Sequence, residues 1–178
     1  FFFKQKTAYE IVDCDWSSDV CSSDLAHLPI SVRISAHDWV EGGITPADAV
    51  SIARAFKAAG ADMIDCSSGQ VSPRQKPTYG RMYQTPFADR IRQEAGIPTI
   101  AVGAISEADH VNSILAAGRA DLCAIARPHL ANPAWTLTEA ARIGYTDQPW
   151  PPAYASAKPQ LESMFARART LQTATRGD

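Results

Sequence analysis

The chain has 178 residues, of which 46% are hydrophobic and 20% charged, and its formal net charge is −2. This composition is typical of one globular domain, gives no reason to expect nucleic acid or an anionic membrane as a partner, and includes no stretch of the roughly 20 apolar residues that a membrane-spanning helix needs. The four cysteines form no C-x-x-C motif and have no regular spacing, which argues against a disulfide framework and against a cysteine metal site.

The first 25 residues have the pattern of translated sequencing-adapter DNA rather than of a protein. Residues 2–10, FFKQKTAYE, and residues 15–25, DWSSDVCSSDL, each translate one half of such an adapter, in the right order and frame. A signal peptide would begin with basic residues and continue with an apolar stretch, and this segment does neither. We therefore expect residues 1–25 to be non-native and base the fold on residues 26–178.

Four short apolar runs follow, and they predict strands buried on both faces because they lack a clean alternation. The runs are 29–35, 61–67, 98–104 and 120–126. Helical patterns lie between and after them, each opened by a polar or proline residue and ended by a glycine. These patterns run from Thr45-Pro46 to Gly60, from Thr85-Pro86 to Gly96, from Ser106 and Asp109 to Gly118, and from Asn132-Pro133 to Gly144. The repeated strand–helix order predicts a parallel sheet with right-handed crossovers.

Two architectures fit this order, an open doubly wound sheet and part of a closed eight-unit barrel. No G-x-G-x-x-G motif follows the first strand, and the glycine and arginine at the ends of the last two strands suit the phosphate site of a barrel. The sequence therefore predicts an α/β fold, half of a (βα)8 TIM barrel (units five to eight), over residues 26–146. Residues 147–178 are predicted to form a proline-rich linker and a C-terminal helix over 158–172.

Chemistry in such a barrel occurs at the C-terminal ends of the strands, and phosphate commonly binds after strands seven and eight. In that numbering Gly103 ends strand seven, and Ala126 and Arg127 end strand eight. Gly103 would let the backbone approach an anion closely, and Arg127 offers a guanidinium fork for two phosphate oxygens. The alternative is a turn glycine and a surface arginine.

Arg33 lies within the first apolar run, three positions from its end. A buried, unpaired charge is costly, so an arginine at this position needs a partner. One interpretation is that Arg33 points to the barrel mouth and faces an electron-rich ligand. The other is a structural ion pair with Asp38 or Asp65.

The loop over residues 70–84 is long and polar, and its side chains include Lys76, Tyr79, Arg81 and Tyr83. Long ordered loops at this face often bind substrate, whereas a solvated connection is the alternative. Cys66 and Cys123 are expected in the core, and Cys66 has no histidine placed to activate it. The histidines lack the spacing of metal ligands, so the chain is predicted to hold no metal, and the residues considered so far include no candidate for catalysis.

Five motifs indicate a known family: VRISAHDW (32–39), GADMIDCSSG (60–69), TPFADRIR (85–92), TIAVGAI (99–105) and GRADLCAIARPHLANP (118–133). In them the chain resembles the C-terminal half of the Old Yellow Enzyme family of FMN-dependent ene-reductases, in its short, thermophilic-like subgroup. The tail PWPPAYASAKPQLE (149–162) is also similar to the end of the reductase half of aminobenzoyl-CoA or salicylyl-CoA monooxygenases.

The resemblance implies FMN as the cofactor and NAD(P)H as the hydride donor. Arg33 matches the arginine that contacts the pyrimidine edge of the flavin, where a cation stabilises negative charge. Gly103, Ala126 and Arg127 match the cradle of the FMN phosphate. The family usually has Gly-Arg where this chain has Ala126-Arg127, a change that keeps the backbone N–H.

Several family residues would lie before residue 26: those beside the flavin on strand one, the histidine pair or His/Asn pair that binds the substrate carbonyl, and the proton-donating tyrosine. We therefore expect a fragment of an FMN-dependent NAD(P)H oxidoreductase that is inactive alone. A non-catalytic half-barrel scaffold and a fragment of another phosphate-binding barrel enzyme are the alternatives. For the full-length enzyme the resemblance implies an activated alkene or an enoyl- or aryl-CoA substrate, a cytoplasmic location and a homo-oligomer.

Overall fold

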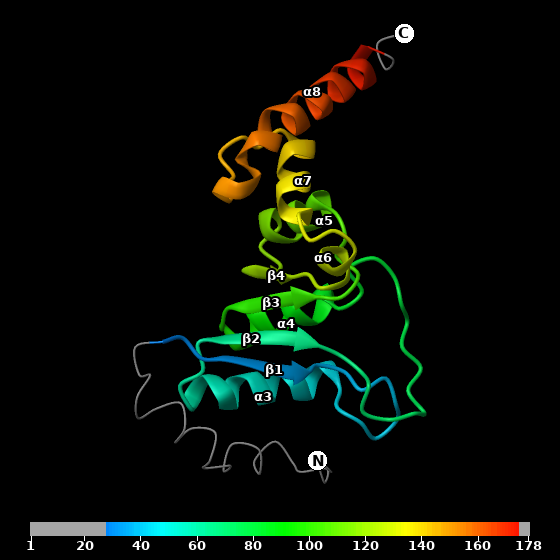
Figure 1. Ribbon diagram of the computed structural model, residues 1–178. Coiled ribbons are helices and arrows are strands. Elements are labelled where there is room, and N and C mark those ends of the chain that lie inside the picture. The colour runs from blue at the N-terminus through cyan, green and yellow to red at the C-terminus, as the bar shows by residue number, and fades with distance from the viewer. Residues whose placement is uncertain (1–27, 175–178) are drawn as a thin grey trace. The chain divides into compact units, whose positions relative to one another are not determined.

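The computed structural model describes residues 28–174, which form two compact units (Figure 1). The first unit comprises residues 28–105 and 110–124, and the second comprises residues 106–109 and 125–174. Each unit is described separately below. The segment 1–25, which we expect to be non-native, lies outside the described residues.

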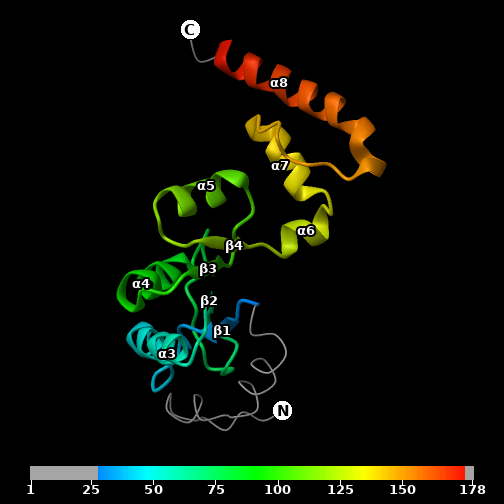
Figure 2. The same cartoon turned by 90° about the vertical axis from the view of Figure 1, so that its left-hand side faces the viewer.

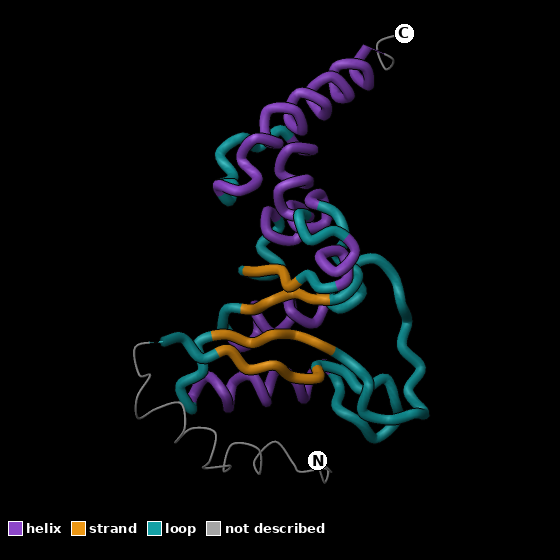
Figure 3. The backbone as a smooth tube through the Cα atoms, in the orientation of Figure 1, coloured by secondary structure: helices purple, strands orange, loops and turns teal. Residues whose placement is uncertain are grey.

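The first unit is built on a four-stranded parallel sheet in the order β1-β2-β3-β4. The strands are β1 (Ser31–Ser35), β2 (Met63–Ser67), β3 (Thr99–Val102) and β4 (Leu122–Ala124), drawn in orange in Figure 3. All four fall within the predicted runs and are shorter than them. The sheet confirms the predicted parallel α/β order.

Helices α3 (Pro46–Ala58) and α4 (Thr85–Ala95) lie on the same side of this sheet (Figure 2). The main core of the unit lies between them and the strands, and it is made of small and branched apolar side chains, because every second strand residue points to the helices. Its buried members include Ile34, Val50, Ala53, Ile64, Cys66, Ala88, Ile91 and Ala101. The other side of the sheet stays partly exposed, and the candidate site lies there.

The helix boundaries confirm one predicted start and correct another. At α3, Asp48 N donates to Thr45 Oγ1 and Thr45 N donates to Asp48 Oδ2, which is the reciprocal capping box that the sequence indicates. At α4, Thr85 is the first helical residue rather than the cap, and Gln84 precedes it as the cap. The prediction fails here because the Thr85 hydroxyl is buried without a hydrogen-bond partner among the described residues and so caps no backbone N–H.

The second unit is helical and contains α6 (Arg127–Ala131), α7 (Trp135–Ile143), the 3-10 helix η1 (Pro152–Ala157) and α8 (Lys158–Ala174). The predicted C-terminal helix is confirmed in α8. Arg169 on this helix donates to the carbonyls of Ala141 and Arg142, the last exposed acceptors of α7. Helix α5 (Ala108–Ala116) begins in this unit, where Ala108 N donates to Glu139 Oε2.

The connection after β4 differs from the prediction. The strand ends at Ala124, so Arg127 does not end it but begins the short helix α6. The fourth predicted helix, α7, starts at Trp135 instead of following Asn132 directly, although Asn132 Oδ1 still accepts a hydrogen bond from Ala134 N. The Arg-Pro pair explains α6, because proline in a first turn favours helix initiation.

Candidate functional site

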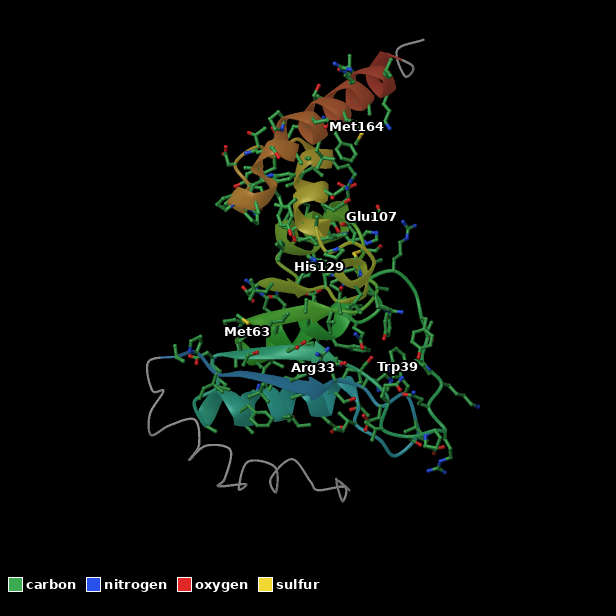
Figure 4. All side chains as sticks on the ribbon, viewed as in Figure 1. Arg33, Trp39, Met63, Glu107, His129 and Met164 are labelled. Atoms are coloured by element: carbon green, nitrogen blue, oxygen red, sulfur yellow. The ribbon has the colours of Figure 1, made fainter. Side chains whose placement is uncertain are left out.

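The C-terminal ends of β1, β2 and β3 carry the polar side chains of the first unit that are candidates for function. Register pairs Arg33 with Asp65, Asp65 with Ile100, and Ile100 with Leu122. Paired side chains in a sheet point to the same face, so these four form one row across it, on the side away from α3 and α4. We call this row the open face. Figure 4 labels Arg33 on β1 and Trp39 in the loop that follows.

Arg33 forms the ion pair with Asp65 that one interpretation predicted, and its side chain also reaches solvent. Its Nη1 lies 3.5 Å from Asp65 Oδ2, yet 57% of the arginine side chain is exposed against 16% for the aspartate. The expectation of a buried arginine was therefore wrong, because β1 is an edge strand and its guanidinium reaches solvent. Asp38 is not the partner, since its carboxylate accepts from Ser35 Oγ and Ile44 N.

Burial raises the pKa of the Asp65 carboxyl, and the nearby Arg33 cation opposes that rise. One carboxylate oxygen, Oδ1, is buried without a hydrogen-bond partner among the described residues, which accounts for the unfavourable environment of the charged form. The Arg33 guanidinium thus offsets part of the cost of desolvating the Asp65 carboxylate, and the rest of its side chain is exposed to solvent.

Replacing Arg33 with glutamine is expected to raise the pKa of Asp65 further, since only desolvation then acts on the carboxyl. A folded-state pKa above the unfolded one contributes stability below the unfolded pKa, and that contribution is lost as the pH rises through the folded pKa. In the variant, the loss of stability with rising pH should therefore extend to higher pH than in the parent, because the folded-state pKa of Asp65 is higher. A carbon-13 NMR titration of the Asp65 carboxyl measures the change, with Arg90→Gln on α4 as the control. An unchanged pKa in Arg33→Gln would contradict the coupling.

A chain of buried hydrogen bonds ties the three strand ends together. Trp39 Nε1 donates to Ser68 Oγ over 3.0 Å, and Ser68 Oγ donates to Gln84 Oε1 over 2.6 Å. Gln84 Nε2 then donates to the carbonyl of Val102 over 3.0 Å. Ser68 and Gln84 are both buried, so the bonds form in a water-poor environment that strengthens them. The loops after β1, β2 and β3 are thereby held in one arrangement.

Gly103 follows β3 at a position that only glycine fits. Its φ is +102°, and a Cβ built there would overlap Gln84 Nε2 and lie 3.0 Å from Tyr83 Cε1. Two neighbouring side chains therefore pack directly against this backbone. The close approach at Gly103 is thus made by side chains of the protein itself, and the predicted contact with an anion stays a prediction.

Between residues 28 and 174, four non-glycine residues adopt positive φ, and all of them lie in the loops around these strand ends: Trp39, Gln70, Met82 and Ala104. Such conformations cost energy and are retained mainly where the surroundings enforce them, often at ligand sites. Because they gather at the C-terminal ends of the strands, they support this end of the sheet as the functional one.

Ala126 and Arg127 belong to the second unit, at the start of α6. Both are exposed, and Ala126 O accepts the helical hydrogen bond of Leu130 N. Within the described part of the chain, no ion pair is found for Arg127, so its guanidinium is available to an anion. Of the four predicted cofactor contacts, these two therefore belong to the second unit, whereas Arg33 and Gly103 belong to the first.

The cysteines differ in burial. Cys66 is buried as expected, and burial raises the pKa of its thiol to about 12, so the thiol is protonated near neutral pH. Cys123 is only half-buried, because it lies on the edge strand β4, and the expectation of a core position was wrong. In residues 28–174 no group of three potential metal-ligating side chains occurs, and no helix is long and apolar enough to cross a membrane.

Sequence reasoning missed Gln84, which connects Ser68 to Val102 and packs against Gly103. No pattern distinguishes it from the two other glutamines of the same loop, Gln70 and Gln75. Ser68 carried a weak signal, since it lies in the Ser-Ser-Gly turn after β2, but its partner could not be identified without the fold.

Comparison with known proteins agrees with the family that the sequence motifs resemble. The model of the NADH:flavin oxidoreductase / NADH oxidase family matches residues 10–144. The matched range begins inside segment 1–25, so it does not support a boundary at residue 25.

The chain is also similar to proteins named NADPH dehydrogenase. It is 45% identical to one from Halalkalibacterium halodurans over 118 residues, 66% of this chain and 35% of the relative. It is 44% identical to one from Geobacillus thermodenitrificans over 116 residues, 65% of this chain and 34% of the relative. A Listeria innocua relative is 41% identical over 118 residues. The chain thus spans about a third of the length of these relatives.

Proposed function

The chain belongs to the NADH:flavin oxidoreductase / NADH oxidase family, and on that premise we propose that it carries part of the flavin site of an FMN-dependent oxidoreductase whose hydride donor is NAD(P)H. The observation that carries the proposal is the family match over residues 10–144, which includes the whole sheet and both loops that flank Arg33. The names of the relatives, NADPH dehydrogenase, support the same donor.

The residues present fit an FMN. Arg33 holds a half-exposed guanidinium on the open face, where it would lie against the pyrimidine edge of the flavin. In the second unit, Arg127 has no ion-pair partner among the described residues, and its guanidinium would bind the FMN phosphate together with the N–H of Ala126. In the first unit, Gly103 keeps the assignment to the phosphate cradle that the family resemblance gives it. When bound, FMN supplies hydride transfer between NAD(P)H and an electron-poor alkene.

We propose further that the sheet represents units five to eight of an eight-stranded barrel and that the chain is inactive by itself. The sheet has four strands, and the chain spans about a third of its relatives. In the family that the motifs resemble, the substrate-binding histidine pair and the proton-donating tyrosine belong to earlier units of the barrel, which supports this proposal. The similarity of the tail to the reductase half of CoA-dependent monooxygenases supports an enoyl- or aryl-CoA thioester as an alternative to a simple activated alkene.

The test is a fluorescence titration of FMN with the 178-residue chain and three variants. Arg33→Gln and Arg127→Gln are each expected to weaken binding about five- to tenfold, the loss of one charge-assisted hydrogen bond. Arg90→Gln removes an equal charge from an ion pair on α4 and should leave the affinity unchanged. Circular dichroism confirms that each variant is folded. Equal affinities in all four proteins would refute the assigned flavin contacts.

Activity separates an incomplete enzyme from a scaffold. Cyclohexenone and NADPH are expected to remain unconverted by the chain alone, and turnover would refute the proposed inactivity. Co-expression with the N-terminal two thirds of the Geobacillus thermodenitrificans relative should yield a complex that retains FMN through gel filtration. A complex that assembles but retains no flavin would favour the non-catalytic scaffold.

A further inference from the structure

The loop between β2 and α4 is the most strongly charged segment of the first unit. No aspartate or glutamate occurs between Asp65 and Asp89, while three cations do: Arg74, Lys76 and Arg81. All three side chains are exposed. We call residues 70–84 the cationic loop; Figure 3 shows it in teal, extending from the C-terminal ends of the strands.

These three cations differ from the other cations of the first unit, each of which has a partner. The paired ones are Arg33 with Asp65, Arg54 with the carbonyl of Glu94, Lys57 with the carbonyls of Ala95 and Gly96, Arg90 with Glu94, Arg92 with Asp121, and Arg119 with Asp89. Across residues 28–174, no side-chain hydrogen bond or ion pair is found for the three cations of the loop. Exposed, unpaired like charges in one short segment repel one another, and a bound anion would relieve that repulsion.

The cationic loop is held in place by its backbone. Lys76 N donates to the carbonyl of Trp39 over 2.8 Å, Gln70 N donates to Gln75 Oε1 over 2.6 Å, and Met82 N donates to the carbonyl of Ala104 over 3.3 Å. Gln70 and Met82, at its two ends, both have positive φ. A strained loop with several tertiary hydrogen bonds presents its cations in a defined arrangement, which lowers the entropy cost of binding.

An aromatic pair lies in the same loop. The rings of Tyr79 and Tyr83 meet edge to face with centroids 5.3 Å apart, and Tyr79 is 66% exposed. Tyr83 in turn packs beside Gly103. An exposed aromatic face is a stacking platform for a nucleobase, and here it adjoins cations on one side and the proposed flavin site on the other.

We propose that the cationic loop binds an adenosine diphosphate that carries a further phosphate on its ribose, with Arg74, Lys76 and Arg81 on the phosphates and Tyr79 on the adenine. This chemistry occurs both in NADPH and in coenzyme A. The inference rests on the proposed function, because it names the recognition element for the phosphorylated co-substrate of that site. The loop adjoins the C-terminal ends of β1 and β3, where Lys76 N bonds to the carbonyl of Trp39 and Met82 N to that of Ala104, so a nucleotide held there would lie beside the proposed flavin contacts of the first unit.

The test is calorimetric titration of the full chain, without FMN, by NADP⁺, NAD⁺, coenzyme A and inorganic phosphate. NADP⁺ or coenzyme A is expected to bind about tenfold more tightly than NAD⁺, because the added phosphate meets an unpaired cation. Arg81→Gln should weaken that binding about five- to tenfold and flatten its salt dependence, whereas Arg90→Gln should not. Tyr79→Ala should weaken it about fivefold or more through lost stacking, and Tyr79→Phe should retain it.

The four ligands and the variants of this titration distinguish the possible results. Tight NADP⁺ with weak coenzyme A identifies the hydride donor as the ligand, and the reverse identifies an acyl-CoA substrate. Equal binding of NAD⁺ and NADP⁺, competition by inorganic phosphate at similar concentration, or equal effects of Arg81→Gln and Arg90→Gln would overturn the proposal. Because FMN is absent from the titration, a chain that fails to hold flavin can still pass this test, so the two proposals fail separately.

Discussion

Replacing Gly103 with alanine is expected to lower the free energy of unfolding by about 2–5 kcal/mol. Two effects add. An L-residue at a φ of +102° is strained, which costs about 1–2 kcal/mol, and the new methyl group overlaps the side chain of Gln84. Gln84 cannot move freely, because it is hydrogen-bonded to both Ser68 and the carbonyl of Val102.

Gly60 provides a matched control for this prediction. Its φ is +98°, nearly that of Gly103, but a Cβ built there meets nothing within 4 Å. Gly60→Ala should therefore cost only the backbone strain, about 1–2 kcal/mol. Urea denaturation followed by circular dichroism measures both variants. Equal losses in the two would show that the contact with Gln84 has no energetic weight.

A double-mutant cycle isolates the contact. Gln84→Ala removes the closer of the two side chains that the new methyl group meets, so Gly103→Ala in that background should cost less than in the parent, with only the backbone strain and the contact with Tyr83 remaining. The difference between the two backgrounds is the steric term, expected to be about 1–3 kcal/mol. Additive losses would contradict the packing of Gln84 against Gly103.

Local patterns predicted the secondary structure well because they depend on nearby residues alone. The four glycines expected to end helices, Gly60, Gly96, Gly118 and Gly144, all have positive φ just after a helix. The Thr45–Asp48 capping box formed as the spacing indicated. Parallel pairing followed from the strand–helix order, since parallel strands need crossovers of this length.

Tertiary context accounts for what could not be predicted. The role of Gln84 could not be predicted because its side chain bonds to Ser68 and Val102, residues 16 and 18 positions away. Arg33 proved half-exposed because its side chain lies on the face of the sheet away from α3 and α4, and strand order alone does not tell how well that face is covered. The sequence shows the cationic loop as a polar segment. Only the structure shows that, among the described residues, the other cations of the first unit have partners and those of this loop do not.

The purified chain is expected to self-associate at concentrations in the ~10 μM range. Among the described residues β1 and β4 each have a strand neighbour on one side only, so both edges present unpaired backbone groups. The open face adds apolar surface at one of these edges, since Leu122 on β4 is 51% exposed. Sedimentation velocity over a range of concentrations measures the association.

Leu122→Lys should shift the chain toward monomer, raising the dissociation constant about tenfold or more, because it replaces buried apolar contact with a charge at the sheet edge. Leu115→Lys is the matched control, since Leu115 is also an exposed leucine of the first unit, 40% accessible, but lies on α5 away from the sheet. A monodisperse monomer from the unsubstituted chain, or equal effects of the two lysines, would contradict association through the open sheet. Association through β4 would mean that this edge accepts a further strand, as a half-barrel requires of both its edges.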